Sequence, residues 1–126
     1  MAAGLATLDV IESERLVSHS EQLGDRLRNR LSGLVGRYEF LRDVRGKGLM
    51  IGIEFGPPTS LKLKASWNLL ESANKGLFCQ LITIPLFAEH KILTQVAGHA
   101  SHTVKLLCPL VINDADCDWK IGRAHV

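Results

Sequence analysis

The sequence lacks both a strong excess of charge and a long apolar run. Its 15 Lys and Arg residues nearly balance its 13 Asp and Glu residues, so the net charge is only +2. This balance argues against nucleic acid as a partner, because nucleic-acid binding relies on a basic surface. No apolar stretch approaches the ~20 residues of a membrane span, and the N-terminus has no basic signal-peptide region before Asp9. The sequence therefore predicts a cytoplasmic protein with neither nucleic acid nor a membrane as its partner.

Cysteine is also scarce. The three residues, Cys79, Cys108 and Cys117, are widely and irregularly spaced, and no two of them form a C-x-x-C pair. An odd number at this spacing is not a disulfide framework, and the missing pair excludes a zinc knuckle. We expect reduced thiols, one or two of them buried, and no nucleophilic cysteine, because the sequence shows no neighbouring base.

The sequence does contain enough apolar material for one folded domain. Its 126 residues are 46% hydrophobic and 22% charged, which are ordinary values for a globular chain. Leucines at helical spacing predict one long helix over residues 3–34, with a break near 18–20. The clearest strand covers residues 49–55, where the odd-numbered side chains face the core and Gly52 leaves space on the opposite face.

Shorter elements complete the pattern. A proline at position 85 predicts a kink or a helix start there, and Asn113 or Asp114 is expected to cap a terminal helix. Together the elements predict an α+β fold, with a small, mostly antiparallel sheet, a long N-terminal helix and helices that cover one face. The remaining elements are expected at 38–44 (strand), 45–48 (turn), 60–71 (helix, with Leu61, Leu63, Trp67 and Leu70 as its apolar set), 77–90 (helix), 92–96 (strand) and 103–107 (strand).

Three short motifs carry groups that could act in chemistry. The segment 46–48, Gly-Lys-Gly, departs from both phosphate-loop patterns, so it predicts a hairpin turn. His99 and His102 have no third ligand nearby, so they do not predict a metal site. Lys105 lies between two apolar residues of a strand, where it either extends its ammonium group into water or holds a carboxylate; the pattern alone favours water. The residues alone predict no assembled catalytic site.

Several segments, in order along the chain, resemble class III pyridoxal-phosphate aminotransferases. The most specific is 44–55, Val-Arg-Gly-Lys-Gly-Leu-Met-Ile-Gly-Ile-Glu-Phe, which is similar to the family signature R-G-x-G-L-M-x-G-x-E followed by Phe or Leu. Residues 104–110, Val-Lys-Leu-Leu-Cys-Pro-Leu, resemble the family motif R-x-x-P-P-L. Further matches lie at 2–12, 23–28, 89–94 and from 114 onward. The resemblance identifies the chain as a fragment, the C-terminal small domain of such an enzyme.

The resemblance implies a dimeric parent enzyme of fold type I. It would transfer an amino group from an amino acid or an ω-amine to a keto acid through pyridoxal phosphate. The Schiff-base lysine and the phosphate-binding loop belong to the family's large domain, so we expect no catalytic, cofactor-binding or metal-binding residue in this chain, and no activity from it alone. The implied partners are small amino and keto acids, the large domain and a second subunit. The alternative is a free-standing, non-catalytic module that binds an amino acid or dimerises.

Two departures from the family motif bear on a substrate site. Lys105 stands where many members have an arginine that grips the substrate carboxylate, and a lysine cannot form the same bidentate fork. Cys108 stands where the family has the first proline of its motif. The resemblance implies that Lys105, together with Thr94 and Gln95, lies at the mouth of the active site. These three are therefore the candidate substrate-binding residues.

The last six residues, 121–126, break the pattern of the rest. Their sequence, Ile-Gly-Arg-Ala-His-Val, resembles the translation of a widely used sequencing adapter. We therefore expect residues 1–120 to be the small-domain fragment and 121–126 to be foreign to it.

Overall fold

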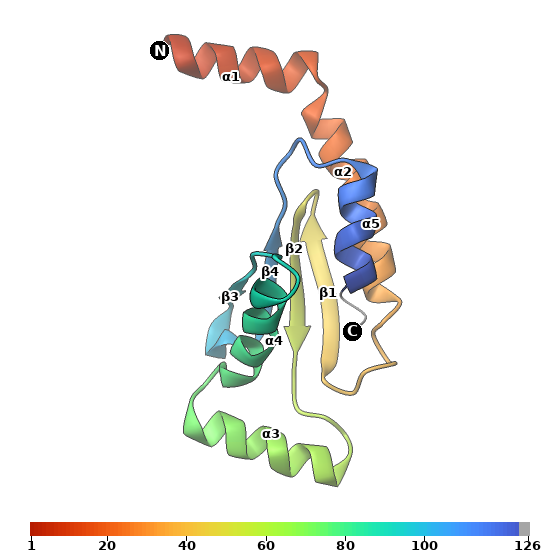
Figure 1. Ribbon diagram of the computed structural model, residues 1–126, viewed down its shortest axis with the longest axis vertical. Coiled ribbons are helices and arrows are strands. Elements are labelled where there is room, and N and C mark those ends of the chain that lie inside the picture. The colour runs from red at the N-terminus through yellow and green to blue at the C-terminus, as the bar shows by residue number, and fades with distance from the viewer. Residues whose placement is uncertain (124–126) are drawn as a thin grey trace.

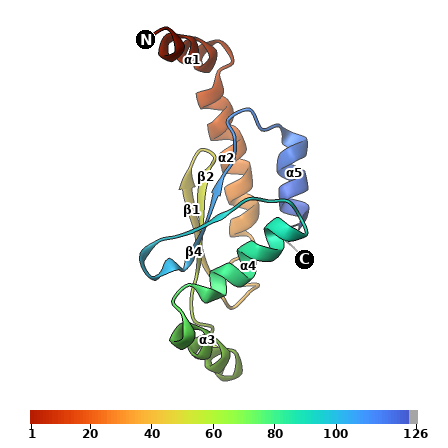
Figure 2. The same cartoon turned by 60° about the vertical axis from the view of Figure 1, so that its left-hand side comes forward.

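The computed structural model describes residues 1–123, apart from the side chains of residues 99 and 120–123. The described residues form an α+β fold, as the sequence predicts, with one four-stranded sheet and helices packed on one side of it (Figures 1 and 2). The helices are α1 (Ala2–Ser13), α2 (Leu16–Ser32), α3 (Leu61–Ala73), α4 (Leu77–Ala88) and α5 (Asp114–Arg123), with a short 3-10 turn at His99–Ser101; the strands are β1 (Leu41–Lys47), β2 (Met50–Phe55), β3 (Gln95–Ala97) and β4 (Thr103–Leu107).

Two helices replace the single long N-terminal helix. The predicted break near 18–20 is wrong, because the chain bends at Arg15, which adopts a left-handed conformation (φ 51°, ψ 40°). The serines at the predicted break are accommodated within α2 instead. Ser18 donates to the Arg15 carbonyl at 3.0 Å, and Ser20 accepts from the Leu49 backbone N–H at 3.2 Å. As a result, α1 projects away from the body of the molecule (Figure 1) and buries no residue.

The sheet has the strand order β1-β2-β4-β3, and every neighbouring pair is antiparallel. β1 begins three residues later than predicted and continues through the expected turn to Lys47, so that the hairpin turns at Gly48–Leu49. The alternation predicted for 49–55 is confirmed, since Leu49 and Ile51 are buried while Met50 is 56% exposed. β3 covers Gln95–Ala97 and not the predicted 92–96, and Ile92 is buried in the loop before it. β4 has the predicted bounds.

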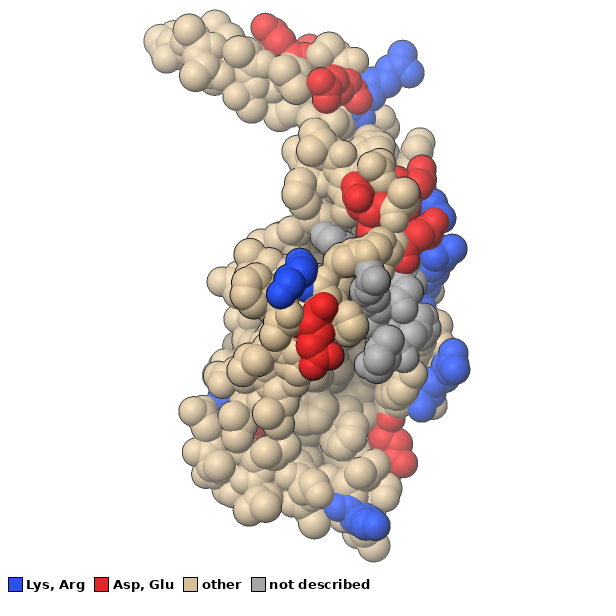
Figure 3. Space-filling view, viewed as in Figure 1, with Lys and Arg blue, Asp and Glu red and all other residues tan. Residues whose placement is uncertain are grey.

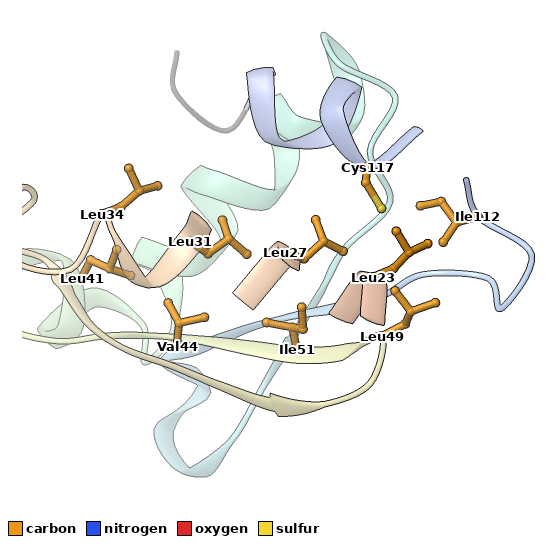
Figure 4. Packing of buried hydrophobic residues seen from close by; sticks show 10 residues of the cluster. All are labelled: Leu23, Leu27, Leu31, Leu34, Leu41, Val44, Leu49, Ile51, Ile112 and Cys117. Atoms are coloured by element: carbon orange, nitrogen blue, oxygen red, sulfur yellow. The ribbon is translucent and has the colours of Figure 1, made fainter. Parts of the chain in front are cut away.

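The core lies between α2 and the sheet. α2 supplies a stripe of leucines with a helical period, and the sheet supplies the residues of alternate positions on its covered face. Ile112 and Cys117 close the end nearest α5. Figure 4 shows these side chains pointing toward one another; they are Leu23, Leu27, Leu31, Leu34, Leu41, Val44, Leu49, Ile51, Ile112 and Cys117.

The hairpin β1–β2 packs unusually closely on α2. A Cβ atom added at Gly24 would lie 2.0 Å from the Gly48 carbonyl oxygen, and one added at Gly48 would lie 2.5 Å from the Ser20 hydroxyl. Gly48 also has a φ of 53°, which favours glycine. Gly48 is therefore explained by the docking of the turn on α2, whereas a Cβ atom at Gly46 would meet the backbone of Met50 on the paired strand β2.

The helices between β2 and β3 depart in part from expectation. α3 buries Trp67, but Leu61 is 85% exposed and Leu63 is 37% exposed, so only part of the predicted apolar set faces inward. Trp67 instead joins an aromatic cluster with Phe40 and Phe78. α4 starts at Leu77 and contains Pro85 within it, so the proline does not start the helix.

The terminal helix α5 begins as predicted, at a reciprocal cap. The Asp116 N–H donates to the Asn113 side chain at 2.9 Å, and the Asn113 N–H donates to the Asp116 carboxylate at 3.3 Å. Asp118 then pairs with Arg26 and Arg30 of α2, and charged side chains gather along this α2–α5 edge in Figure 3. Of the tail predicted to be foreign, the backbone of residues 121–123 continues α5, and 124–126 lie outside the described residues.

Candidate functional site

The sheet has one covered and one open face. Helices α2 and α4 contact the covered face, and Figure 2 shows the helices α2, α4 and α5 on that same side. Residues directly opposite each other in antiparallel strands share a face, so the strand registers define the open face completely. Its members are Asp43, Arg45 and Lys47 of β1, Met50, Gly52 and Glu54 of β2, Thr103, Lys105 and Leu107 of β4, and Gln95 and Ala97 of β3.

The registers bring two of the three candidate residues together. Lys105 lies opposite Gly52 on one side and opposite Gln95 on the other. Directly opposed side chains in antiparallel strands have Cβ atoms about 4.5–5.5 Å apart. The side chains of Lys105 and Gln95 are therefore immediate neighbours. Gly52 contributes no side chain on the other side of the lysine, where the Thr103 methyl group would lie 3.2 Å from an added Cβ atom. This row is the centre of the candidate site.

Thr94, the third candidate residue, precedes β3 and has no place in the strand pairing. Its hydroxyl oxygen is buried and has no hydrogen-bond partner among the described residues. A buried hydroxyl without a partner is destabilised by its lost hydration. Thr94 therefore lies beside Gln95 with an unused hydrogen-bonding group.

The charges around Lys105 are unevenly paired. Arg45 forms ion pairs with Glu54 and with Asp43 on the same open face, and Lys47 pairs with Glu21 at 3.2 Å. In the part of the chain that the structure describes, no carboxylate lies within salt-bridge distance of Lys105. Because Arg45 holds the nearest acidic side chain of β2, Lys105 remains available to an external anion.

The Gly-Lys-Gly segment is the end of a β-hairpin and not a phosphate cradle, although only Gly48 lies in the turn and Gly46 and Lys47 belong to β1. Helix α2 approaches its backbone closely, and the Ser20 hydroxyl already accepts the Leu49 N–H. Lys47 is 86% exposed and points to Glu21. This segment therefore does not fit the phosphate or the aldehyde of pyridoxal phosphate.

A second polar cluster lies at the far end of the sheet. His102 is 2.6 Å from a Glu71 carboxylate oxygen and packs edge-on against Trp67. The described residues include no group of three side chains that could hold a metal ion.

Burial, followed by the Glu71 charge, raises the pKa of the Cys79 thiol from 9.0 to about 11. Cys79 is consequently a protonated thiol at neutral pH, without nucleophilic character.

The sequence did not reveal the Arg45 pairs or the position of Gly52 beside Lys105. Alternation along each strand assigns these side chains to a face, but only the register places them in one row.

A cavity of about 450 Å³ also exists on the covered side, between α4 and the core. Its described lining is mostly apolar and includes none of the candidate residues.

Comparison with known proteins establishes the family. The chain matches the family described as aminotransferase class-III over residues 1–125, and it therefore belongs to that family. It is 36% identical to a diaminobutyrate–2-oxoglutarate aminotransferase of Rhizobium meliloti over 97% of this chain and 25% of that protein. Over 53 residues it is 47% identical to a taurine–pyruvate aminotransferase of Bilophila wadsworthia, covering 42% of this chain and 12% of that protein.

The fold comparison agrees. The structure resembles that of acetylornithine aminotransferase from Elizabethkingia anophelis, with a TM-score of 0.62 and 26% identity, over 94% of this chain and 26% of that one. The chain thus spans about a quarter of the length of most of the relatives it matches, for example 25%. Among the described residues, no helix has both the length and the apolar character needed to cross a membrane.

Proposed function

We propose that this chain is the C-terminal small domain of a cytoplasmic class III aminotransferase that transfers an amino group from an amino acid or an ω-amine to a keto acid. Family membership supports the reaction class. The share of its relatives that the chain spans supports its being one domain of a longer enzyme, which we propose acts as a homodimer. Pyridoxal phosphate would supply the electron sink of the reaction. The rest of the enzyme would hold it, since the glycine turn of this chain does not fit it.

The role we propose for this domain is to bind the acidic group of the substrate. The observation that carries this proposal is the position of Lys105 on the open face, opposite Gly52 and Gln95 and without an ion pair among the described residues. An unpaired ammonium group on an uncovered sheet face attracts an anion. Gln95 would add a hydrogen bond to the same group. The Thr94 hydroxyl is buried, so it would join them only if binding of the substrate exposes it.

The relatives' names leave the particular substrate open. One acts on diaminobutyrate and 2-oxoglutarate, and another on taurine and pyruvate. All four carry an acidic group, which is the feature that Lys105 would recognise. The proposal is therefore restricted to an acidic donor or acceptor.

The test is to recover the full-length gene, screen amine donors and compare Lys105→Ala with the wild-type enzyme. We expect KM for carboxylated substrates to rise about 10-fold or more, since a hydrogen bond to a charged group contributes about 1.5–3 kcal/mol. Lys64→Ala, at an exposed lysine of α3, is the matched control and should leave KM unchanged. An unchanged KM in Lys105→Ala would remove Lys105 from the site.

A further inference from the structure

The cavity between α4 and the core has room for a small organic molecule. Its volume of about 450 Å³ falls within the range of about 300–1,000 Å³ that is typical of ligand pockets. Ordinary protein cores, by contrast, contain few voids larger than a water molecule. The described walls come from α2, α4 and the covered face of the sheet, and most of them are apolar, for example at Leu31, Phe78 and Leu106. An aliphatic chain that enters this space is therefore removed from water, which favours its binding.

The mouth of the cavity carries a negative charge. The described lining contains one carboxylate, that of Glu89, and neither a lysine nor an arginine. Glu89 is also exposed to solvent, so its carboxylate lies at the rim. Among the described residues it takes part in no ion pair. Lys91, two positions along the chain, donates to the Ala88 carbonyl at 2.7 Å instead, so Glu89 remains available to an external cation.

Helix α4 adds to this negative potential. Glu89 is the C-cap of α4, so its side chain stands at the C-terminal end of the helix. The carbonyl groups of the last helical turn carry a partial negative charge, which stabilises a cation placed near them. The carboxylate and the helix end therefore favour the same sign of charge, opposite to the sign that Lys105 attracts on the other face of the sheet.

We infer that the cavity binds a small cation with an apolar tail, an alkylammonium ion whose chain lies under α4 and whose head group pairs with Glu89. The inference does not depend on the proposed function, because the described lining includes none of Lys105, Thr94 and Gln95. It gives the chain a second binding site, on the covered side of the sheet.

Isothermal titration calorimetry on the full-length enzyme tests the inference. The probes are butyl-, hexyl- and octyltrimethylammonium, which have no N–H group and so cannot act as amino donors. Each added methylene should tighten Kd about fourfold, and the heat-capacity change of binding should become more negative as more apolar surface is buried. A Kd that does not depend on chain length would overturn the inference. So would a complete lack of binding, the result expected if the rest of the enzyme fills the cavity.

Two variants locate the head group and the tail. Glu89→Gln should weaken octyltrimethylammonium about threefold, the effect of an exposed ion pair, and leave the binding of 1-octanol unchanged. Glu14→Gln is the matched control, because Glu14 is the exposed C-cap of α1; it should affect neither ligand. Leu81 lines the cavity and is 53% exposed, so Leu81→Trp should narrow the entrance without disturbing the core and weaken both ligands. The inference is wrong if Glu89→Gln behaves like Glu14→Gln, or if Leu81→Trp leaves both Kd values unchanged.

Discussion

A single methyl group at Gly24 tests whether the hairpin β1–β2 is fixed by its contact with α2. In an open helix, Gly→Ala stabilises by about 1 kcal/mol because glycine is the more flexible residue. At Gly24 the new Cβ would lie 2.0 Å from the Gly48 carbonyl oxygen and 2.3 Å from its carbon. Both are backbone atoms, so the turn must move away from α2 by more than about an ångström. This movement also separates the core side chains that pack between the hairpin and α2. Overpacking of this kind costs about 1–3 kcal/mol, so we expect Gly24→Ala to be destabilising by about 1–2 kcal/mol.

Equilibrium unfolding in urea, followed by circular dichroism, measures this effect. The free energy of unfolding falls by about 1–3 kcal/mol for each molar of urea. The unfolding midpoint of Gly24→Ala should therefore fall by roughly 1 M. Gly4→Ala in α1 is the matched control, because no heavy atom lies within 4 Å of its added Cβ; its midpoint should not fall. A Gly24→Ala variant as stable as Gly4→Ala would refute the close contact, and with it the explanation given for Gly48.

Two further predictions concern the thiol and the cofactor. Burial raises the pKa of the Cys79 thiol from 9.0 to about 11. As the pH rises, the thiol therefore ionises in the unfolded chain at a lower pH than in the folded chain. The stability from the buried thiol is complete below pH 9.0 and is lost as the pH rises toward 11. Cys79→Ala should show a smaller decline over this window in urea unfolding, and parallel stability curves would contradict the assignment. The isolated chain mixed with pyridoxal phosphate and treated with borohydride should yield no single preferentially modified lysine by mass spectrometry. Stoichiometric trapping at one lysine would show that this chain holds the Schiff base itself.

Local patterns predicted the elements that depend on local physics. The alternation from Leu49 to Phe55 gave the correct buried face, because a strand has a period of two whatever its neighbours are. Asn113 was correctly expected near the start of α5, because a cap depends on groups three residues apart. The bend at Arg15 was missed because a left-handed residue is ordinarily sought at glycine or asparagine.

The candidate site could be predicted only in part. The family resemblance singled out Lys105, Thr94 and Gln95, but the row formed by Gly52, Lys105 and Gln95 depends on register. Register arises from the pairing of segments that are far apart in the chain, and a shift by one residue would move Lys105 to the covered face. The same reason hid the ion pairs of Arg45, whose partner Glu54 lies on the next strand.

The strand order also determines when the anion site can form during folding. β1, β2 and α2 are joined by short connections, so their contacts close small loops. β4, by contrast, inserts beside β2 only after residues 56–102 have been brought round between them. Closing a loop of that size costs on the order of 3 kcal/mol in chain entropy, so we expect β4 to join a hairpin that is already in place. Lys105 would then reach Gly52 in a late step of folding, and an intermediate that lacks this step would have a nearly complete core but no site for an acid.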